Sequence, residues 1–130
     1  MMASGIEIRA AHFPGRAPID AYGNGGFRFA DMSHRGSILC LPSGIHGWDV
    51  SSFGDVGEAD LARLLEEAAE FDILLVGTGD TLIPMPPQMR RSFREAGVAV
   101  ETMATGAAVR TYNVLLAEDR TVAAALIAVD

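Results

Sequence analysis

Two short stretches carry the residues best suited to bind a negatively charged group. Residues 77–79 read Gly-Thr-Gly directly after the apolar run 73–76, and glycines at a strand end let backbone amides approach a ligand closely. Residues 105–110 begin a predicted helix, whose free N–H groups and positive dipole end attract anions. An arginine one turn later adds a fork-shaped donor. The candidate ligand-binding residues are Gly77, Thr78, Gly79, Thr105, Gly106 and Arg110, with Tyr112 and Asn113 as weaker additions.

These glycines do not complete a nucleotide-binding motif. A dinucleotide fingerprint needs a third glycine three positions after the second, where this chain has Leu82. A P-loop needs a lysine, and the sequence contains none, which also excludes Schiff-base chemistry and a lysine base. A structural explanation stays open, in which Thr105 caps its helix, the small residues permit close packing and Arg110 pairs with a carboxylate.

Other reactive side chains lack the partners that catalysis or metal binding requires. Cys40 lies in the apolar run 38–41, where burial hides a thiol and raises its pKa, so we expect core packing rather than a nucleophile. The three histidines are scattered without metal-ligand spacing, so we expect no metal site and no cofactor. Ser43, His46 and Asp49 have the residue types of a catalytic triad, but three members within seven residues do not easily form its relay.

A basic cluster stands out in an acidic chain. The formal net charge is −7, which opposes nucleic-acid binding. The cluster consists of Arg90, Arg91 and Arg94, on one predicted helix and without the interleaved aromatic residues that bind single strands. Two explanations stay open: a solvated helix face, or a contact patch for an acidic protein partner.

The apolar spacing predicts strands and turns in the first half and alternating strands and helices in the second. We predict strands near residues 6–9 and 44–50 and a β-hairpin over 26–41. We further predict helices over 58–71, 86–95 and 105–117 and strands at 73–76, 98–102 and 121–129. The last strand is apolar on both faces and should lie centrally. This order predicts an α/β fold: a three-layer domain with a mixed central sheet, helices covering it and an additional β-hairpin layer.

Length and composition fit a single domain spanning residues 1–130. With 49% hydrophobic and 21% charged residues, the chain has the composition of an ordinary globular protein. No apolar run reaches the length of a membrane span, and the N-terminus does not have the pattern of a secretory signal. A single cysteine fits a reducing compartment. We therefore expect a small cytoplasmic protein, and the sequence leaves its oligomeric state open.

Several segments together resemble a known family. They are YGNGGFRF, SILCLPSGIHGWDV, DILLVGTG, TGAAVRTYNVLLAEDR and VAAALIAV. The family consists of small, largely uncharacterised bacterial proteins and includes the mitochondrial respiratory complex I assembly factor 3 and an adipogenesis-associated cytosolic relative. The resemblance implies a three-layer α/β fold and no established enzymatic activity. Family members usually carry a cysteine where this chain has Val109, which weakens any thiol role there.

Two functional hypotheses follow from the sequence. The first is a non-catalytic binding or assembly protein, for which the resemblance implies a respiratory-complex subunit as partner. It is favoured because the chain has no complete cofactor motif, credible nucleophile or lysine. The alternative is a protein that binds a small anionic ligand, or an unrecognised enzyme, with its pocket at residues 77–79 and 105–110.

Overall fold

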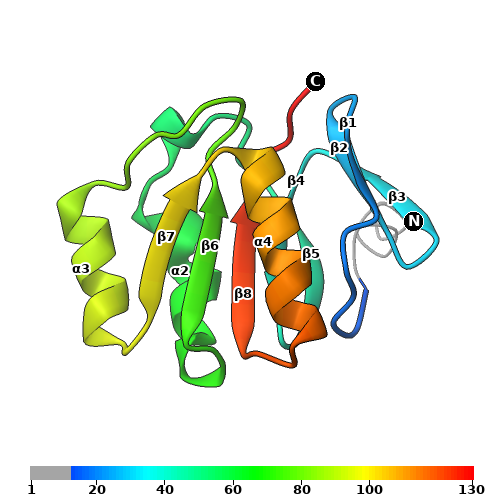
Figure 1. The fold of residues 1–130 in the computed structure, drawn as a ribbon. Helices are drawn as coiled ribbons and strands as arrows, with labels where there is room; N and C mark the ends of the chain where they lie inside the picture. The colour runs from blue at the N-terminus through cyan, green and yellow to red at the C-terminus, as the bar shows by residue number, and fades with distance from the viewer. Residues whose placement is uncertain (1–12) are drawn as a thin grey trace, which may run out of the picture.

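A five-stranded mixed sheet forms the centre of the computed structural model, which describes residues 13–130 (Figure 1). The strand order is β5-β4-β8-β6-β7. Strand β6 pairs in parallel with β7 and β8, whereas β4 pairs antiparallel with β5 and β8. The strands are β4 (Ser37–Leu41), β5 (Gly44–Trp48), β6 (Ile73–Gly77), β7 (Ala99–Met103) and β8 (Val122–Leu126). The predicted strand near residues 6–9 lies outside the described residues.

A second, three-stranded antiparallel sheet packs beside the first. It consists of β1 (Ala21–Gly23), β2 (Gly26–Phe29) and β3 (Met32–Arg35). Ala30 and Asp31 connect β2 to β3 with φ angles of 50° and 62°, as two-residue hairpin turns require. The predicted hairpin over 26–41 is therefore too long. At Gly36, with φ of 98°, the chain leaves this sheet and enters the central one as β4.

Within residues 13–130, three helices cover the central sheet: α2 (Glu58–Glu66), α3 (Pro87–Glu95) and α4 (Thr105–Ala117). Helix α2 ends before the predicted residue 71, because a separate 3₁₀ turn, η2 (Ala68–Glu70), follows it. This tighter turn leaves Ala68 and Phe71 buried in the same core as α2. Another short turn, η1 (Phe53–Asp55), precedes α2. No helix within residues 13–130 is long and apolar enough to cross a membrane.

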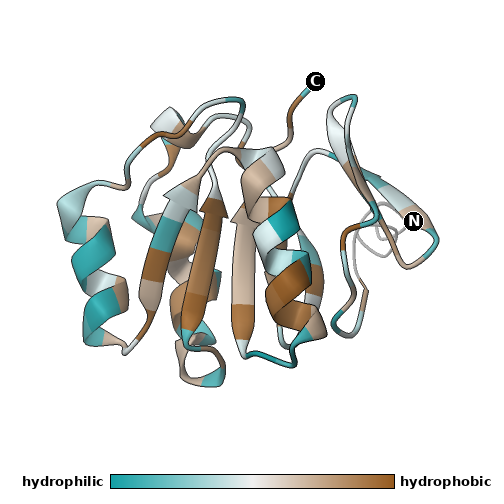
Figure 2. Cartoon of the chain, viewed as in Figure 1, coloured by the Kyte–Doolittle hydropathy of each residue, from teal (hydrophilic) through white to brown (hydrophobic). Residues whose placement is uncertain are grey.

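The two faces of the central sheet carry two separate cores. Along β8, Ala123 and Ala125 face the core shared with α2 and α3, whereas Val122, Ala124 and Leu126 face α4 and the small sheet. All five residues are buried, so the predicted central position of this strand is confirmed. Figure 2 shows the apolar character of β6 beside it and the largely hydrophilic α3 at the outside. Helices α2 and α3, the sheet, and α4 with the small sheet are the three predicted layers.

Both outer strands of the central sheet have contacts along their free edges. Phe13 pairs with Ile45 of β5 in an isolated bridge, and the two residues exchange backbone hydrogen bonds of 3.0 and 2.8 Å. On the opposite edge, Arg90 of α3 donates from Nη1 to the carbonyl oxygen of Val100 in β7, at 2.8 Å. The hydrogen-bonding groups of each edge are thus partly occupied by the chain itself.

Cys40 lies in the core beneath α4, as expected from its apolar neighbours. The side chain is fully buried and contacts the buried Tyr112. Burial raises the pKa of the Cys40 thiol to about 12, and a hydrogen bond with Tyr112 offsets this only in part. At neutral pH the thiol is therefore protonated and shielded from solvent.

We predict that native Cys40 resists modification by a thiol-reactive disulfide reagent such as Ellman's reagent. Reaction should require unfolding, so its rate should fall roughly 10³-fold or more below that of the denatured chain, in line with the small unfolded fraction. Absorbance of the released thiolate, followed with and without denaturant, measures both rates. Equal rates in the two states would show that the thiol is accessible.

Candidate functional site

The parallel pairing of β6 and β7 brings the two predicted stretches together. Gly77 and Met103 are register partners at the ends of these strands, so the loops that follow begin side by side. The backbone N–H of Gly79 donates to Thr105 Oγ1 at 3.0 Å, and the N–H of Thr105 donates to the Gly79 carbonyl at 2.8 Å. The glycine loop and the start of α4 thus form one hydrogen-bonded unit.

Thr105 is the central residue of this unit. Its side chain is completely buried, and its hydroxyl donates to the carbonyl of Ile127 at 2.8 Å while accepting from Gly79. One hydroxyl therefore joins the loop after β6, the first turn of α4 and the segment after β8. Thr105 is not the capping residue that the structural explanation assumed, because the N-cap position belongs to Ala104.

The hydroxyl of Thr78 also bonds to backbone rather than facing a ligand. It donates to the Thr81 carbonyl at 2.7 Å and accepts from the N–H of Ile83 at 2.9 Å. The side chain is buried. Thr78 therefore fixes the path of the loop that leads towards α3.

Two glycines have steric reasons to be glycine. A Cβ on Gly77 would lie 2.9 Å from the Cα of Thr105, so only glycine lets α4 begin this close to β6. A Cβ on Gly106 would collide with the hydroxyl of Tyr22. The β1 strand and the first turn of α4 are therefore in close contact.

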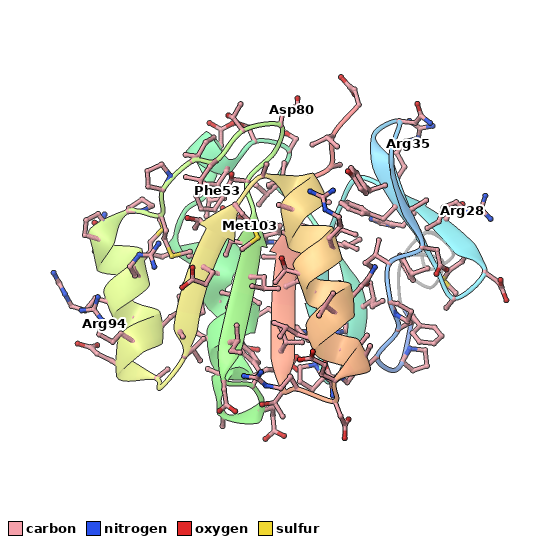
Figure 3. The ribbon with its side chains drawn as sticks, viewed as in Figure 1. Arg28, Arg35, Phe53, Asp80, Arg94 and Met103 are labelled. Atoms are coloured by element: carbon pink, nitrogen blue, oxygen red, sulfur yellow. The ribbon has the colours of Figure 1, made fainter. Side chains whose placement is uncertain are left out.

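A cavity of about 250 Å³ opens above this unit. Gly79, Gly106 and Arg110 line it, whereas Gly77, Thr78 and Thr105 are buried and do not. The remaining lining residues are Tyr22, Asp80, Ala104, Ala107 and Val129. Sequence reasoning missed Tyr22 and Asp80: Tyr22 comes from a strand that it did not predict, and no spacing connects it to α4. Figure 3 shows Asp80 at this rim.

The electrostatics of the cavity are mixed. The amides of Gly106 and Ala107 lie in the first turn of α4, where helical N–H groups have no intrahelical acceptor. With the exposed Arg110 they favour an anion. Asp80 places a carboxylate on the same rim, and its negative charge repels a bound anion. The site therefore suits a weakly charged anion better than a highly charged one.

The arginine cluster of α3 divides into one anchored and two free side chains. Arg90 is half-buried and bonded to Val100, as described above, while Arg91 and Arg94 are exposed. Figure 3 shows Arg94 pointing away from the protein. Among residues 13–130 the structure contains one salt bridge, Arg63–Glu67, so neither exposed arginine of α3 has an acidic partner among those residues.

Ser43 and His46 lie together, but not in a catalytic relay. Ser43 Oγ lies 3.2 Å from His46 Nε2 and donates to Glu67 Oε2 at 3.0 Å. Because its proton is directed to Glu67, the histidine does not act as its base. Arg63 Nη2 also lies 3.3 Å from His46 Nε2, and Asp49 lines a different part of the surface. Within residues 13–130, no three His, Cys, Asp or Glu side chains are arranged to hold a metal ion.

Comparison with known proteins places the chain in a family. A family model described as a protein of unknown function, DUF498/DUF598, matches residues 19–127. The chain belongs to this family. An uncharacterised member from Rhodobacter capsulatus is 40% identical over 119 residues, covering 92% of this chain and 90% of that relative. The resemblance noted from the sequence motifs is thereby confirmed.

Relatives of this DUF498 protein also include a mitochondrial assembly factor. The mouse NADH dehydrogenase (ubiquinone) 1 alpha subcomplex assembly factor 3 is 32% identical over 122 residues, which cover 94% of this chain but 66% of the mouse protein. A crystal structure from Bartonella henselae, described as an outer membrane protein, is 59% identical with a TM-score of 0.87 and covers 91% of this chain and 99% of its own. The mixed α/β fold of this chain is thus similar to that of the Bartonella protein.

We predict that Thr105→Val destabilises the protein by about 2–4 kcal/mol, because it leaves the Gly79 N–H and the Ile127 carbonyl buried without partners. Thr111→Val in the same helix is the matched control. Thr111 is half-exposed and bonds to Ala107, so its loss should cost less than about 1 kcal/mol. Urea denaturation followed by circular dichroism measures both values. Equal losses would contradict the central role of Thr105.

Proposed function

We propose that this DUF498 protein is a non-catalytic binding protein that assists the assembly of a larger protein complex. The observation that carries the proposal is the 32% identity to an assembly factor across 94% of the chain. The natural first candidate for a partner is a subunit of a respiratory complex, as the name of that relative suggests.

The chemistry of the loop unit supports binding rather than catalysis. Its two threonine hydroxyls bond to backbone groups, at Ile127 for Thr105 and at Thr81 for Thr78. The thiol of Cys40 is buried, and the hydroxyl of Ser43 donates to a carboxylate. These groups hold the fold together, and they are poorly placed for nucleophilic attack.

The exposed face of α3 is the contact surface that we favour. Arg90 fixes the helix to β7, and Phe93 is fully buried beneath it, so α3 is held firmly. Arg91 and Arg94 then project from a rigid support in a chain of net charge −7. An acidic partner surface would gain two charge pairs here, and the planar guanidinium fork matches the geometry of carboxylates.

We predict that Arg91→Glu with Arg94→Glu reduces partner capture about tenfold in a pull-down from a native cytoplasmic extract. A reducing extract fits the single free cysteine and the cytoplasmic location that we propose. The reduction follows because two attractive charge pairs become repulsive. Quantitative mass spectrometry of the captured proteins measures the effect.

The matched control is Arg28→Glu with Arg35→Glu, which makes the same charge change on the exposed side chains of the small sheet. These arginines lie at the opposite side of the molecule from α3 (Figure 3). Capture should be retained in this variant. A partner lost equally from both variants would indicate binding through net charge, and a partner retained by both would contradict the α3 surface.

A second candidate function is the binding of a small anion in the 250 Å³ cavity. The observation that favours it is the shared placement of Gly79, Gly106 and Arg110 around one opening. In this proposal Gly77, Thr78 and Thr105 act from below, by holding the two loops in register. The anion would accept hydrogen bonds from the first-turn amides of α4 and from the guanidinium.

We predict that acetate, a singly charged anion, raises the melting temperature through this cavity. At ten times its Kd, a bound anion stabilises the folded state by about 1.4 kcal/mol. Arg110→Ala should abolish the rise, Arg91→Ala should keep it, and Asp80→Asn should increase it because a repelling charge is removed. Differential scanning fluorimetry at constant ionic strength measures all four proteins. A rise of equal size in Arg110→Ala would exclude the cavity.

A further inference from the structure

A different cavity lies at the other end of α4, away from the loop unit. It has a volume of about 430 Å³ and forms where the segment entering β1 passes the last turns of the helix (Figure 1). Binding sites for small molecules have volumes of about 300–1,000 Å³, so this cavity is large enough for one. Its lining residues are Arg16, Pro18, Asn113, Leu116, Ala117 and Asp119.

Arg16 is the unusual member of this set. One of its terminal nitrogens, Nη2, donates to the carbonyl oxygen of Arg120. Its Nε is buried and has no acceptor, and it is the one such side-chain nitrogen or oxygen within residues 13–130. An unpaired buried N–H of a charged group is costly. Because Nε has no exposed surface, a carboxylate in the cavity would reach the guanidinium through its terminal nitrogens, and Nη1 is not among the buried unpaired atoms.

Asp119 provides a negative charge in the lining of the same cavity. Asp119 is exposed and follows the end of α4, where the helix dipole is negative. Arg63–Glu67 is the one salt bridge among the described residues, so Asp119 and Arg16 are not paired with each other. Both charges therefore remain available to a ligand. A cation is favoured near Asp119 and a carboxylate near Arg16.

The rest of the lining is apolar or already fixed. Pro18, Leu116 and Ala117 present hydrocarbon surface. The amide of Asn113 exchanges two hydrogen bonds with the backbone of Ile19, of 2.9 and 2.8 Å, so it holds the wall of the cavity in place. A guanidinium, a carboxylate and an aliphatic surface therefore converge on one rigid space.

We infer that this cavity binds a small zwitterion, namely a free α-amino acid with an aliphatic side chain. Its carboxylate pairs with Arg16, its ammonium with Asp119 at the negative end of α4, and its side chain packs on Leu116 and Ala117. Arg16 and Pro18 precede the family-matched region 19–127. The site is separate from the α3 surface of the proposed function.

The test compares three probes that differ by one group each. They are L-leucine, 4-methylpentanoate, which lacks the amine, and 3-methylbutylamine, which lacks the carboxylate. Each is titrated into ¹⁵N-labelled protein. We expect leucine to shift the backbone amides of residues 113–119 and the Arg16 Nε–H resonance, with a Kd at least tenfold lower than that of either analogue. Equal affinity for all three probes, or no shift with leucine, would overturn the inference.

Matched variants assign the two charges. Arg16→Gln should weaken leucine binding at least tenfold and leave the affinity for 3-methylbutylamine nearly unchanged. Asp119→Asn should reduce leucine to the affinity of 4-methylpentanoate. Asparagine tolerates the left-handed backbone of this position, where φ is 62°, so the variant preserves the local fold. Arg28→Gln, on β2, is the control and should bind leucine like the unchanged protein.

The amide spectra outside residues 113–119 establish that each variant is folded. Unchanged leucine binding in both Arg16→Gln and Asp119→Asn would contradict the assignment. Partner capture through α3 does not depend on Arg16, so a negative result here leaves the proposed function intact. Conversely, leucine binding with no captured partner would support the cavity alone.

Discussion

The fold depends on a single buried hydroxyl at the point where three segments meet. Thr105 accepts from the loop after β6, begins α4 and donates to the chain leaving β8. Inside a low-dielectric core such a network is rigid when all its members are satisfied, because leaving any one unpaired is expensive. The absent side chain of Gly77 is the steric counterpart, since it lets the helix approach closely enough for these bonds.

Close packing also depends on small side chains at the centre of the sheet. The three consecutive alanines of β8 provide small surfaces to both cores, so the layers on each side can pack near the strand. Larger residues are supplied by the covering elements, such as Tyr112 from α4 and Phe93 from α3. The covering elements thus fill the space above the small residues of β8, and this strand is buried along its whole length.

Much of the architecture follows from local patterns in the sequence. The alternating second half is predicted well, because its strands and helices have clear apolar patterns, and a glycine or proline lies near the boundaries of several of them. The small sheet is predicted less well. Residues 26–41 contain two apolar runs with a turn between them, and only long-range pairing decides that Ser37–Leu41 joins β8 rather than β3.

The candidate sites show the same division. The convergence of residues 77–79 with 105–110 could be predicted, because parallel strands place their carboxyl ends at one edge. The sequence could not predict which hydroxyls bond to backbone groups, because Ile127 and Thr81 are identified as partners only by three-dimensional contact. Arg16 gave no signal in the sequence, because only the three-dimensional structure shows that its Nε is buried without an acceptor. Sequence patterns report residues that are present, and they do not report unmet bonds.

The contacts along the two free edges of the central sheet have a consequence for association between molecules. An open strand edge is a template on which another chain can build, and proteins commonly blunt such edges with charge or cover. Here Phe13 occupies the edge of β5 and the guanidinium of Arg90 occupies that of β7. Arg90 thus occupies a backbone carbonyl of β7 that could otherwise pair with a strand of another molecule. Its two neighbours, Arg91 and Arg94, have exposed side chains instead.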